Sequence, residues 1–252
     1  MVEIDVLIQP VVLRFSLSGD EIVYHFAAGA DATLDRMELL MGVDPAKQSV
    51  FDSNVGFLPV ATTVLIRGKR NVVVDPGNHH TGFYGQLRLA LKRFDLAFND
   101  IDIVVATHSH HDHFASAGLF HGKELVVGEG ELEFSRATIG GPETDAVTHR
   151  LGGVRTVPVQ GELELCAGVR AVSTPGHTPG HICVVAENES ERYLMTGDAA
   201  MTRGEFEGGV LSHWYLPEQL AEMQQSLSRM QSMNPSIVLP GHDRAFRVGE
   251  GA

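Results

Sequence analysis

The sequence predicts an α/β (α+β) protein in which sheets are covered by helices, and three observations lead to this prediction. Short apolar runs of strand length alternate with turn residues. A few segments show the three- and four-residue spacing of amphipathic helices. Polar residues gather just after the apolar runs rather than within them. A chain of 252 residues with 43% hydrophobic residues can bury a full core, as one large domain or two small ones.

The predicted strands are short runs rich in Val, Ile and Leu that are bounded by turn residues. They are 60–66, 71–74, 101–106, 124–127, 168–173, 181–186 and 236–239. Three segments are predicted as helices, namely 31–41, 85–94 and 217–233. In the last of these, apolar residues recur at three- and four-residue steps, which indicates a face packed on the core. The mixture of strands and helices predicts sheets with helices packed against them.

Composition limits the classes of partner. The 32 acidic residues outnumber 19 basic ones and give a net charge of −13, which disfavours nucleic acid or an anionic membrane as a partner. Glu3 and Asp5 stand where a secretory signal would carry Lys or Arg, and no apolar stretch approaches the ~18 residues that cross a bilayer. Two cysteines, Cys166 and Cys183, are too few for a disulfide framework. We therefore expect a cytoplasmic protein that acts on a small molecule, and a homodimer is compatible with the sequence.

Segment 107–113 reads Thr-His-Ser-His-His-Asp-His and carries the strongest chemical signal. Four of the 13 histidines fall within six residues, directly after an apolar strand. Side chains two apart in extended backbone share a face, so His108 and His110 can converge on one ion. If the chain then turns into a helix, Asp112 and His113 point to a neighbouring position. Clustered imidazoles and carboxylates predict a metal site.

Other segments place a single His or Asp at a turn that follows an apolar run. Pro-Gly precedes both His177 and His242, and Gly precedes Asp198. Asp75 directly follows the strand at 71–74. Such turns fix the backbone from which a ligand projects. The nearby His111 and His181 are interpreted as bystanders, because His181 begins the next apolar strand, where packing or hydrogen bonding is the usual role.

These motifs together resemble the metallo-β-lactamase superfamily, and they run from Asp75 to His242 in the family's order. The resemblance implies a single four-layer αββα sandwich over residues 1–252. It assigns the first metal to His108, His110 and His177, and the second metal to Asp112, His113 and His242. Asp198 would bridge the two, Asp112 and Asp198 would be the catalytic carboxylates, and Asp75 would support the ligands from behind.

Imidazole and carboxylate ligands suit two divalent ions, with zinc first and iron or manganese as alternatives. Two ions a few ångströms apart can share a hydroxide whose pKa is lowered toward ~7, and this hydroxide attacks a carbonyl or phosphorus. No protein nucleophile is required. The sequence contains no GxSxG, P-loop or HExxH motif, which are typical of other hydrolase and nucleotide-binding classes.

Within the superfamily, two groups are similar in the remaining motifs. The segments 196–200 and 240–243 resemble N-acyl homoserine lactonases, although Met201 stands where those enzymes usually carry Tyr, and Tyr84 or Tyr215 would have to substitute. The segments 107–120 and 240–248 resemble metallo-β-lactamase domain-containing protein 1, which is associated with RNA cleavage. Antibiotic-degrading members generally lack the carboxylate at Asp198. Glyoxalase II adds a helical domain, whereas only ten residues follow His242.

The acidic composition favours carbonyl chemistry on a small ester, lactone or thioester. A phosphodiesterase or ribonuclease of the same fold is the alternative, and it would need a basic stripe along the phosphate backbone. A metal-binding or redox module without hydrolytic activity is a third possibility. For the favoured substrates, Phe83, Phe206, Trp214 and Tyr215 are expected to form an apolar cleft beside the metals.

Overall fold

The structure is a computed structural model that describes residues 2–18, 21–28, 55–77, 83–150, 156–209, 211 and 216–250. The helix predicted at 31–41 lies outside these residues. No helix in the described ranges is both long enough and apolar enough to span a bilayer.

The first sheet has the strand order β1-β5-β6-β7-β8-β9. Its strands are β1 (Glu3–Ile8), β5 (Thr63–Arg67), β6 (Val72–Val74), β7 (Ile103–Val105), β8 (Glu124–Gly128) and β9 (Thr156–Val159). From β6 to β9 neighbouring strands are parallel, whereas β1 and β5 form an antiparallel edge. The central strands are continuous runs of Val, Ile and Leu because they are buried on both faces.

The second sheet runs in sequence order from β10 to β15. Its strands are β10 (Glu162–Cys166), β11 (Val169–Ser173), β12 (Ile182–Glu187), β13 (Arg192–Gly197), β14 (Ile237–Pro240) and β15 (Phe246–Arg247). All neighbours are antiparallel except β13 and β14, which are parallel because α6 and α7 connect them.

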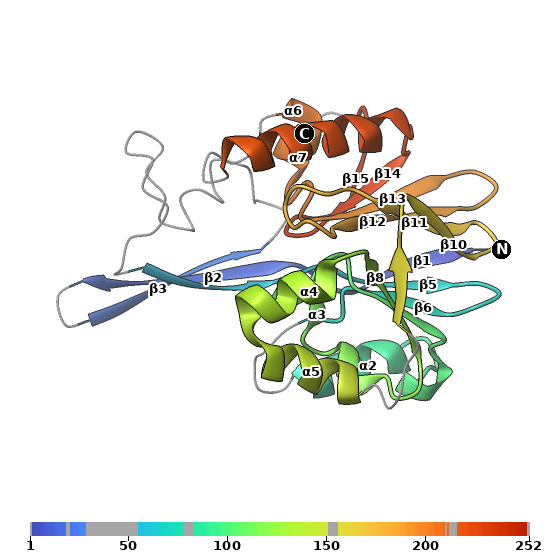
Figure 1. The fold of residues 1–252 in the computed structure, drawn as a ribbon, viewed down its shortest axis with the longest axis horizontal. Coiled ribbons are helices and arrows are strands. Elements are labelled where there is room, and N and C mark those ends of the chain that lie inside the picture. Colours follow the sequence, from blue (N-terminus) through green and yellow to red (C-terminus); the bar gives the residue numbers. More distant parts are fainter. Residues whose placement is uncertain are drawn as a thin grey trace.

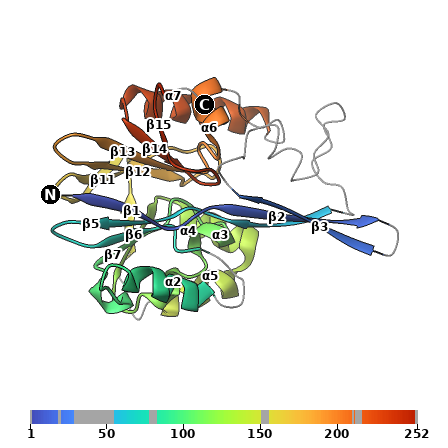
Figure 2. The same ribbon diagram turned by 180° about the vertical axis from the view of Figure 1, so that it is seen from behind.

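The two sheets stack face to face between two layers of helices (Figures 1 and 2). Helices α2 (Phe83–Lys92), α3 (His111–Phe114), α4 (Glu131–Ser135) and α5 (Gly141–Arg150) lie on the first sheet. Helices α6 (Arg203–Gly208) and α7 (Pro217–Ser232) lie on the second. One apolar cluster fills the space between the sheets, and one more lies under each helical layer. This αββα arrangement confirms the predicted fold class.

A third sheet projects from one end of the stacked sheets (Figure 1). It has the antiparallel order β3-β2-β4, with β2 at Val11–Ser18, β3 at Glu21–Ala28 and β4 at Val55–Val60. Nothing in the periodicity of these segments predicted this sheet.

The prediction of a strand over 60–66 is confirmed for 63–66 and wrong at its start, because the chain leaves β4 at Val60 and begins β5 at Thr63. The break has a specific cause at Thr62. Its backbone N–H donates to Gly241 O (2.8 Å), and its hydroxyl donates to Pro240 O (2.7 Å). Thr62 therefore bonds the C-terminal part of the chain instead of a neighbouring strand of its own sheet.

Candidate metal centre

The predicted site residues lie at the ends of strands from both sheets. Asp75 follows β6, and His108 follows β7. Asp198 follows β13, and His242 follows β14. The strands β6 and β7 are parallel to each other, as are β13 and β14, so each pair delivers its residues to one edge of its sheet. His177 reaches the same place from the turn between β11 and β12.

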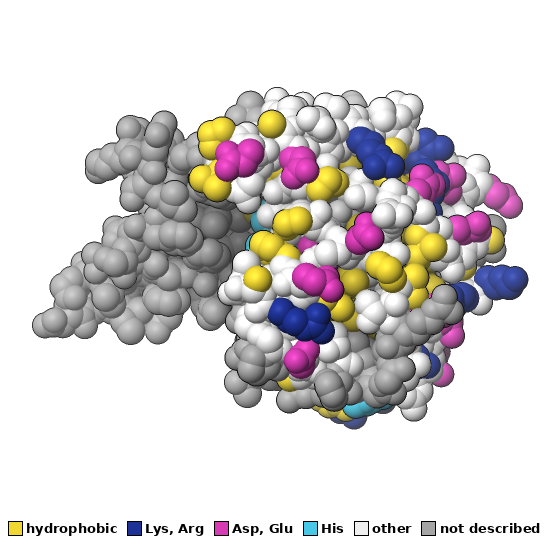
Figure 3. All heavy atoms as spheres, in the orientation of Figure 1, with side chains coloured by type: hydrophobic (Ala, Val, Ile, Leu, Met, Phe, Trp, Pro, Cys, Tyr) yellow, Lys and Arg dark blue, Asp and Glu magenta, His cyan; other side chains and the backbone are white. Residues whose placement is uncertain are grey.

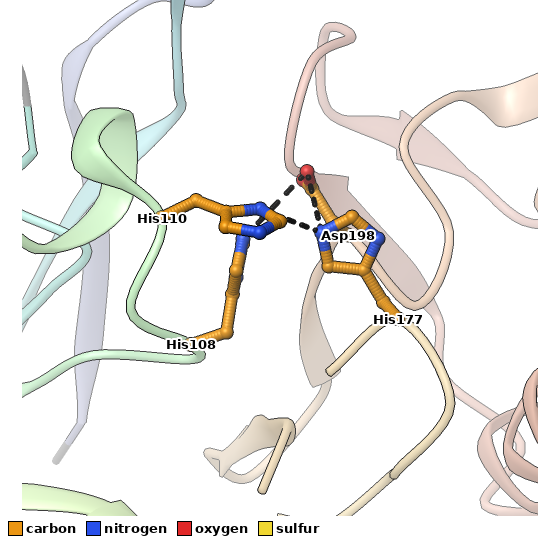
Figure 4. A group of neighbouring side chains, drawn as sticks. All are labelled: His108, His110, His177 and Asp198. Carbon is orange, nitrogen blue, oxygen red and sulfur yellow. Dashed lines mark hydrogen bonds and ion pairs between the residues drawn. The ribbon is translucent and has the colours of Figure 1, made fainter. Parts of the chain in front are cut away.

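The first group of side chains is His108, His110, His177 and Asp198, whose ligand atoms all lie within 4.8 Å of one another. Figure 4 shows the three imidazoles and the carboxylate pointing toward a common position, with His108 and His110 on one loop and His177 and Asp198 on others. His177 Nε2 lies 3.0 Å from His110 Nδ1 and 3.5 Å from Asp198 Oδ2, and His108 Nε2 lies 3.9 Å from the same oxygen. Three nitrogens and one oxygen at this spacing form a set of donors that can surround a cation.

The second group is Asp112, His113 and His242, which also converge within 4.8 Å. His110 is the residue before α3, and Asp112 and His113 lie within this single helical turn, as the sequence predicted. The other oxygen of Asp198, Oδ1, lies 3.2 Å from His113 Nε2 and 3.3 Å from His242 Nε2. The two carboxylate oxygens of Asp198 thus face different groups.

Asp75 lies behind both groups, where its carboxylate fixes the orientation of ligands rather than joining them. Its Oδ2 accepts from the Thr107 hydroxyl and contacts His113 Nδ1, both at 2.8 Å, and its Oδ1 accepts from Thr107 N at 2.7 Å. A carboxylate only accepts, so His113 Nδ1 is protonated, and when the ring is neutral its Nε2 lone pair faces the second group.

Thr107 fixes which nitrogen of His108 is protonated in the same way. Its only hydroxyl proton is directed at Asp75, so the Thr107 oxygen is left to accept from His108 Nδ1, which lies 3.2 Å away. His108 Nε2 is then unprotonated and faces the first group. Asp75 itself has a φ of 52°, a left-handed conformation that orients its carboxylate back across the end of β7.

Protonation differs between the two groups. Burial lowers the pKa of His108 and His177 well below the usual value, and it also lowers the pKa of His110. These three imidazoles are therefore neutral near pH 7, which is the form of imidazole that coordinates an ion. Burial acts in the same direction on His113 and His242, but the neighbouring carboxylates outweigh it. They raise the pKa of His113 well above its usual value and the pKa of His242 to about 9.

The buried donors fit a cation. His108 Nε2 is buried and has no hydrogen-bond partner within the described residues, and the buried Asp198 Oδ1 faces the ligand nitrogens of His113 and His242. An unpaired buried polar atom is costly, and a metal ion would satisfy both. Burial raises the pKa of Asp198, but the charges of His242 and His113 outweigh it and hold the pKa well below its usual value. Positive charge in this pocket is thus favoured, and a divalent cation supplies it.

The two bystander histidines behave differently from each other. His111 is exposed on α3 and belongs to neither group. His181 is fully buried, and it hydrogen-bonds as the sequence favoured: its Nε2 accepts from Asp198 N (3.1 Å), and its Nδ1 lies 2.9 Å from the Thr174 hydroxyl. His181 therefore holds the backbone of Asp198.

Sequence reasoning missed Glu131, a fully buried carboxylate at the start of α4. It accepts hydrogen bonds from the segment that carries His108 and His110 and from the turn that carries His177. A Glu that follows Gly130 and opens a short helix looks like an ordinary helix start. No local signal in the sequence distinguishes it.

The aromatic lining expected from the sequence is partly wrong. Phe83 and Phe206 are only 2% and 3% exposed, because each packs into the core beneath its helical layer. Trp214 and Tyr215 lie outside the described residues. Tyr84 is 54% exposed on α2 and stacks on Phe98.

Met201, at the position where lactonases usually carry Tyr, is buried and acts through its backbone. Its carbonyl accepts from His242 N at 2.9 Å, and its N–H donates to Glu205. Met201, at the position of the expected Tyr, thus holds the loop of His242 through its backbone.

Comparisons with known proteins concern the family and the fold of the chain. Residues 55–242 match the family model described as the metallo-beta-lactamase superfamily. An N-acyl homoserine lactonase from Bacillus sp is 29% identical over 61% of this chain and 60% of its own length. The beta-lactamase-like protein 2 homolog of Drosophila melanogaster is 28% identical over 81% of this chain and 62% of its own. The chain thus spans less than two thirds of the length of these curated relatives.

A similar solved structure is an N-acyl homoserine lactone hydrolase with its product, N-hexanoyl-L-homoserine, bound at the catalytic metal centre. Its TM-score with this chain is 0.62 at 19% identity, and the alignment covers 96% of this chain and 92% of the other. At this identity the likeness concerns the fold.

Proposed function

The chain belongs to the metallo-beta-lactamase superfamily of metal-dependent hydrolases, and on that premise we propose that it binds two divalent ions and hydrolyses a small ester, lactone or thioester. The observation that carries the proposal is the position of Asp198, whose two oxygens face two separate groups of imidazole and carboxylate ligands. We further infer that residues 1–252 act as one domain, in the cytoplasm.

In this proposal His108, His110 and His177 bind one ion, and Asp112, His113 and His242 bind the other. Asp198 contributes one oxygen to each. Zinc suits these nitrogen and oxygen donors, and iron or manganese would be accepted by the same ligands. Bound ions would lower the pKa of a shared water so that hydroxide is available near neutral pH, and would polarise the substrate carbonyl.

The chain's own residues prepare this chemistry in three ways. Thr107 and Asp75 orient the imidazoles of His108 and His113, so that their free nitrogens face the ions. Asp198 faces one ligand group with each of its carboxylate oxygens and so keeps the two groups next to each other. Asp112 Oδ2, which lies 3.3 Å from His242 Nε2, is a carboxylate oxygen at the reaction centre that can take up a proton released during hydrolysis.

Charge supports carbonyl chemistry over phosphodiester cleavage. The net charge of −13 opposes a polyanionic substrate. On the face shown in Figure 3, acidic side chains lie among the basic ones, and histidine side chains are visible at the boundary with the grey region. A small neutral ester or lactone needs no compensating basic stripe. The lactonase relative supports the same substrate class.

A substrate panel tests the proposal. We would compare kcat/KM on acyl homoserine lactones, simple aryl esters and thioesters with kcat/KM on bis-nitrophenyl phosphate and single-stranded RNA. Elemental analysis of the same preparation should approach two equivalents of metal. Asp198→Asn should abolish turnover, whereas the exposed His111→Ala should retain most of it. Efficient RNA cleavage with inert carbonyl substrates would reverse the proposed substrate class and favour the phosphodiesterase alternative.

A further inference from the structure

Glu131 occupies a position that the proposed chemistry does not use. Its side chain is fully buried at the first residue of α4, and it accepts four hydrogen bonds. Oε1 accepts from the backbone N–H and from the hydroxyl of Ser109, both at 2.7 Å. Oε2 accepts from the Thr178 hydroxyl at 2.7 Å and from Gly180 N at 3.1 Å. The two oxygens thus bond two segments that are about 70 residues apart in sequence.

These partners are next to metal ligands. Ser109 stands between His108 and His110, and Thr178 directly follows His177. The residues that this one carboxylate bonds are therefore sequence neighbours of all three imidazoles of the first group. The facing imidazoles of His110 and His177 approach to 3.0 Å, so a small change in loop separation would alter the spacing of the donors.

The fit around Glu131 is tight on the backbone side as well. A β-carbon on Gly180 would lie 2.7 Å from both Cβ and N of Glu131. A β-carbon on Gly128 would lie 1.7 Å from Gly180 O. The turn after His177 therefore packs directly on the start of α4, with no space for adjustment.

We propose that Glu131 is a positioning residue whose carboxylate holds the segment of His108 and His110 and the turn of His177 at the separation that lets these imidazoles share one ion. This inference rests on the proposed function, because it assigns Glu131 to the first group of ligands. Only a carboxylate satisfies all four donors. A glutamine offers one oxygen, so its NH₂ would face either Ser109 N–H or Gly180 N–H, and a backbone N–H cannot reverse its role.

Two measurements on Glu131→Gln test the proposal. In metal-free protein, hydrogen exchange followed by NMR should show at least one of the Ser109 and Gly180 amides exchanging more than about tenfold faster than in the wild type. In cobalt(II) titrations, the affinity for one equivalent should fall roughly 10–100-fold, while the other equivalent binds as before. An equal loss of affinity for both cobalt equivalents would contradict a role of Glu131 in the first group of ligands.

Ser135→Ala is the matched control. Ser135 ends α4, and its hydroxyl lies 2.7 Å from the buried Thr144 hydroxyl on α5, so the variant removes a buried hydrogen bond of the same helix that involves neither loop. It should leave the Ser109 and Gly180 amides and both cobalt equivalents unchanged. Thr178→Val removes a single donor and should show the Glu131→Gln pattern at smaller amplitude, which keeps the test valid if Glu131→Gln does not fold.

The amide data separate the two hypotheses, because they are collected without metal. Unchanged exchange of both amides in Glu131→Gln would overturn the positioning role, whatever the metal binding. Faster exchange in Glu131→Gln would support Glu131 as the link between the two loops even if the wild type binds no cobalt. The absence of cobalt binding in the wild type would reject the proposed function.

Discussion

Gly241 contacts the Asp198 carboxylate so closely that a β-carbon at position 241 would lie 2.2 Å from Asp198 Oδ1. That oxygen is the one that faces His113 and His242. The glycine before His242 therefore sets how near the end of β14 can come to the residue that joins the two ligand groups.

Gly241→Ala should displace Asp198 or the His242 loop and weaken metal binding. The clash involves a carboxylate that is 5% exposed and enclosed by other ligands, so it cannot simply rotate away. We expect cobalt(II) affinity to fall at least tenfold, measured by titration with optical detection. Gly85→Ala is the control, because a β-carbon there meets nothing within 4 Å on α2. Wild-type affinity in Gly241→Ala would show that the close approach is unimportant for the site.

Asp75→Asn should affect the second ion more than the first. The amide would present NH₂ to His113 Nδ1, and the imidazole would then protonate on Nε2, which removes its lone pair from the second group. We expect a loss of roughly 10–100-fold in affinity for one ion, together with a change of the His113 tautomer seen by nitrogen NMR. Asp102→Asn, a change at an exposed carboxylate that accepts from Asn71 N, should have neither effect.

Metal binding should release protons and strengthen with pH. Folding raises the pKa of His242 to about 9 and that of His113 well above 6.5, so both imidazoles carry protons at pH 7 in the metal-free protein. An ion must displace them, because only neutral imidazole coordinates. Calorimetry in buffers of different ionisation enthalpy should report about two protons released at pH 7, and fewer above pH 9. Release that does not change with pH would contradict the assignment of these two residues.

The same shift predicts how the stability of the metal-free protein depends on pH. A raised pKa in the folded state means that the protonated form of His242 stabilises the fold. This contribution is fully present below the unfolded value of 6.5 and is lost as pH rises through about 9. Urea unfolding of metal-free protein should therefore show a falling free energy of unfolding between these pH values. Loading with metal should remove much of that dependence.

His181→Ala should be more harmful than His111→Ala, although sequence reasoning treated both as bystanders. Removing His181 leaves Asp198 N–H buried without its acceptor, which costs about 1–3 kcal/mol. His111 is exposed, and its replacement should change the free energy of unfolding by less than about 0.5 kcal/mol. Equal losses in urea denaturation would contradict the supporting role of His181.

The sequence predicted β6, β7 and β14, three of the strands that end at the site, because each is an apolar run followed by a turn residue such as Gly, Pro, Asp or His. It did not predict β13, the strand that ends next to Asp198. The seven residues that converge in two groups were chosen from the clustered segment 107–113, from turns that follow apolar runs, and from the family resemblance. The third sheet and the strands β1, β9, β10, β13 and β15 were not predicted. Strands β1, β9 and β10 mix exposed and buried residues, so they form no continuous apolar run.

What the sequence could not supply were contacts between distant segments. Glu131 gains its role from Ser109 and Gly180, and Thr62 gains its role from Gly241; neither residue has a local pattern that indicates a partner. Phe83 and Phe206 were placed at a cleft because aromatic residues suit ligands. Their helices instead direct these side chains into the core, where burial of an aromatic ring is more stabilising.

The two ligand groups each combine residues from both sheets: His108, His110, Asp112 and His113 come from the first, and His177, Asp198 and His242 from the second. An ion bound in either group would therefore cross-link the two halves of the sandwich and close a long loop of chain. Cross-links of this kind restrict the unfolded ensemble and oppose separation of the halves. Unfolding of the loaded protein would then require an ion to leave before the sheets part. The unfolding rate of the loaded protein should increase with the affinity of an added chelator. The metal-free protein should unfold much faster at the same denaturant concentration.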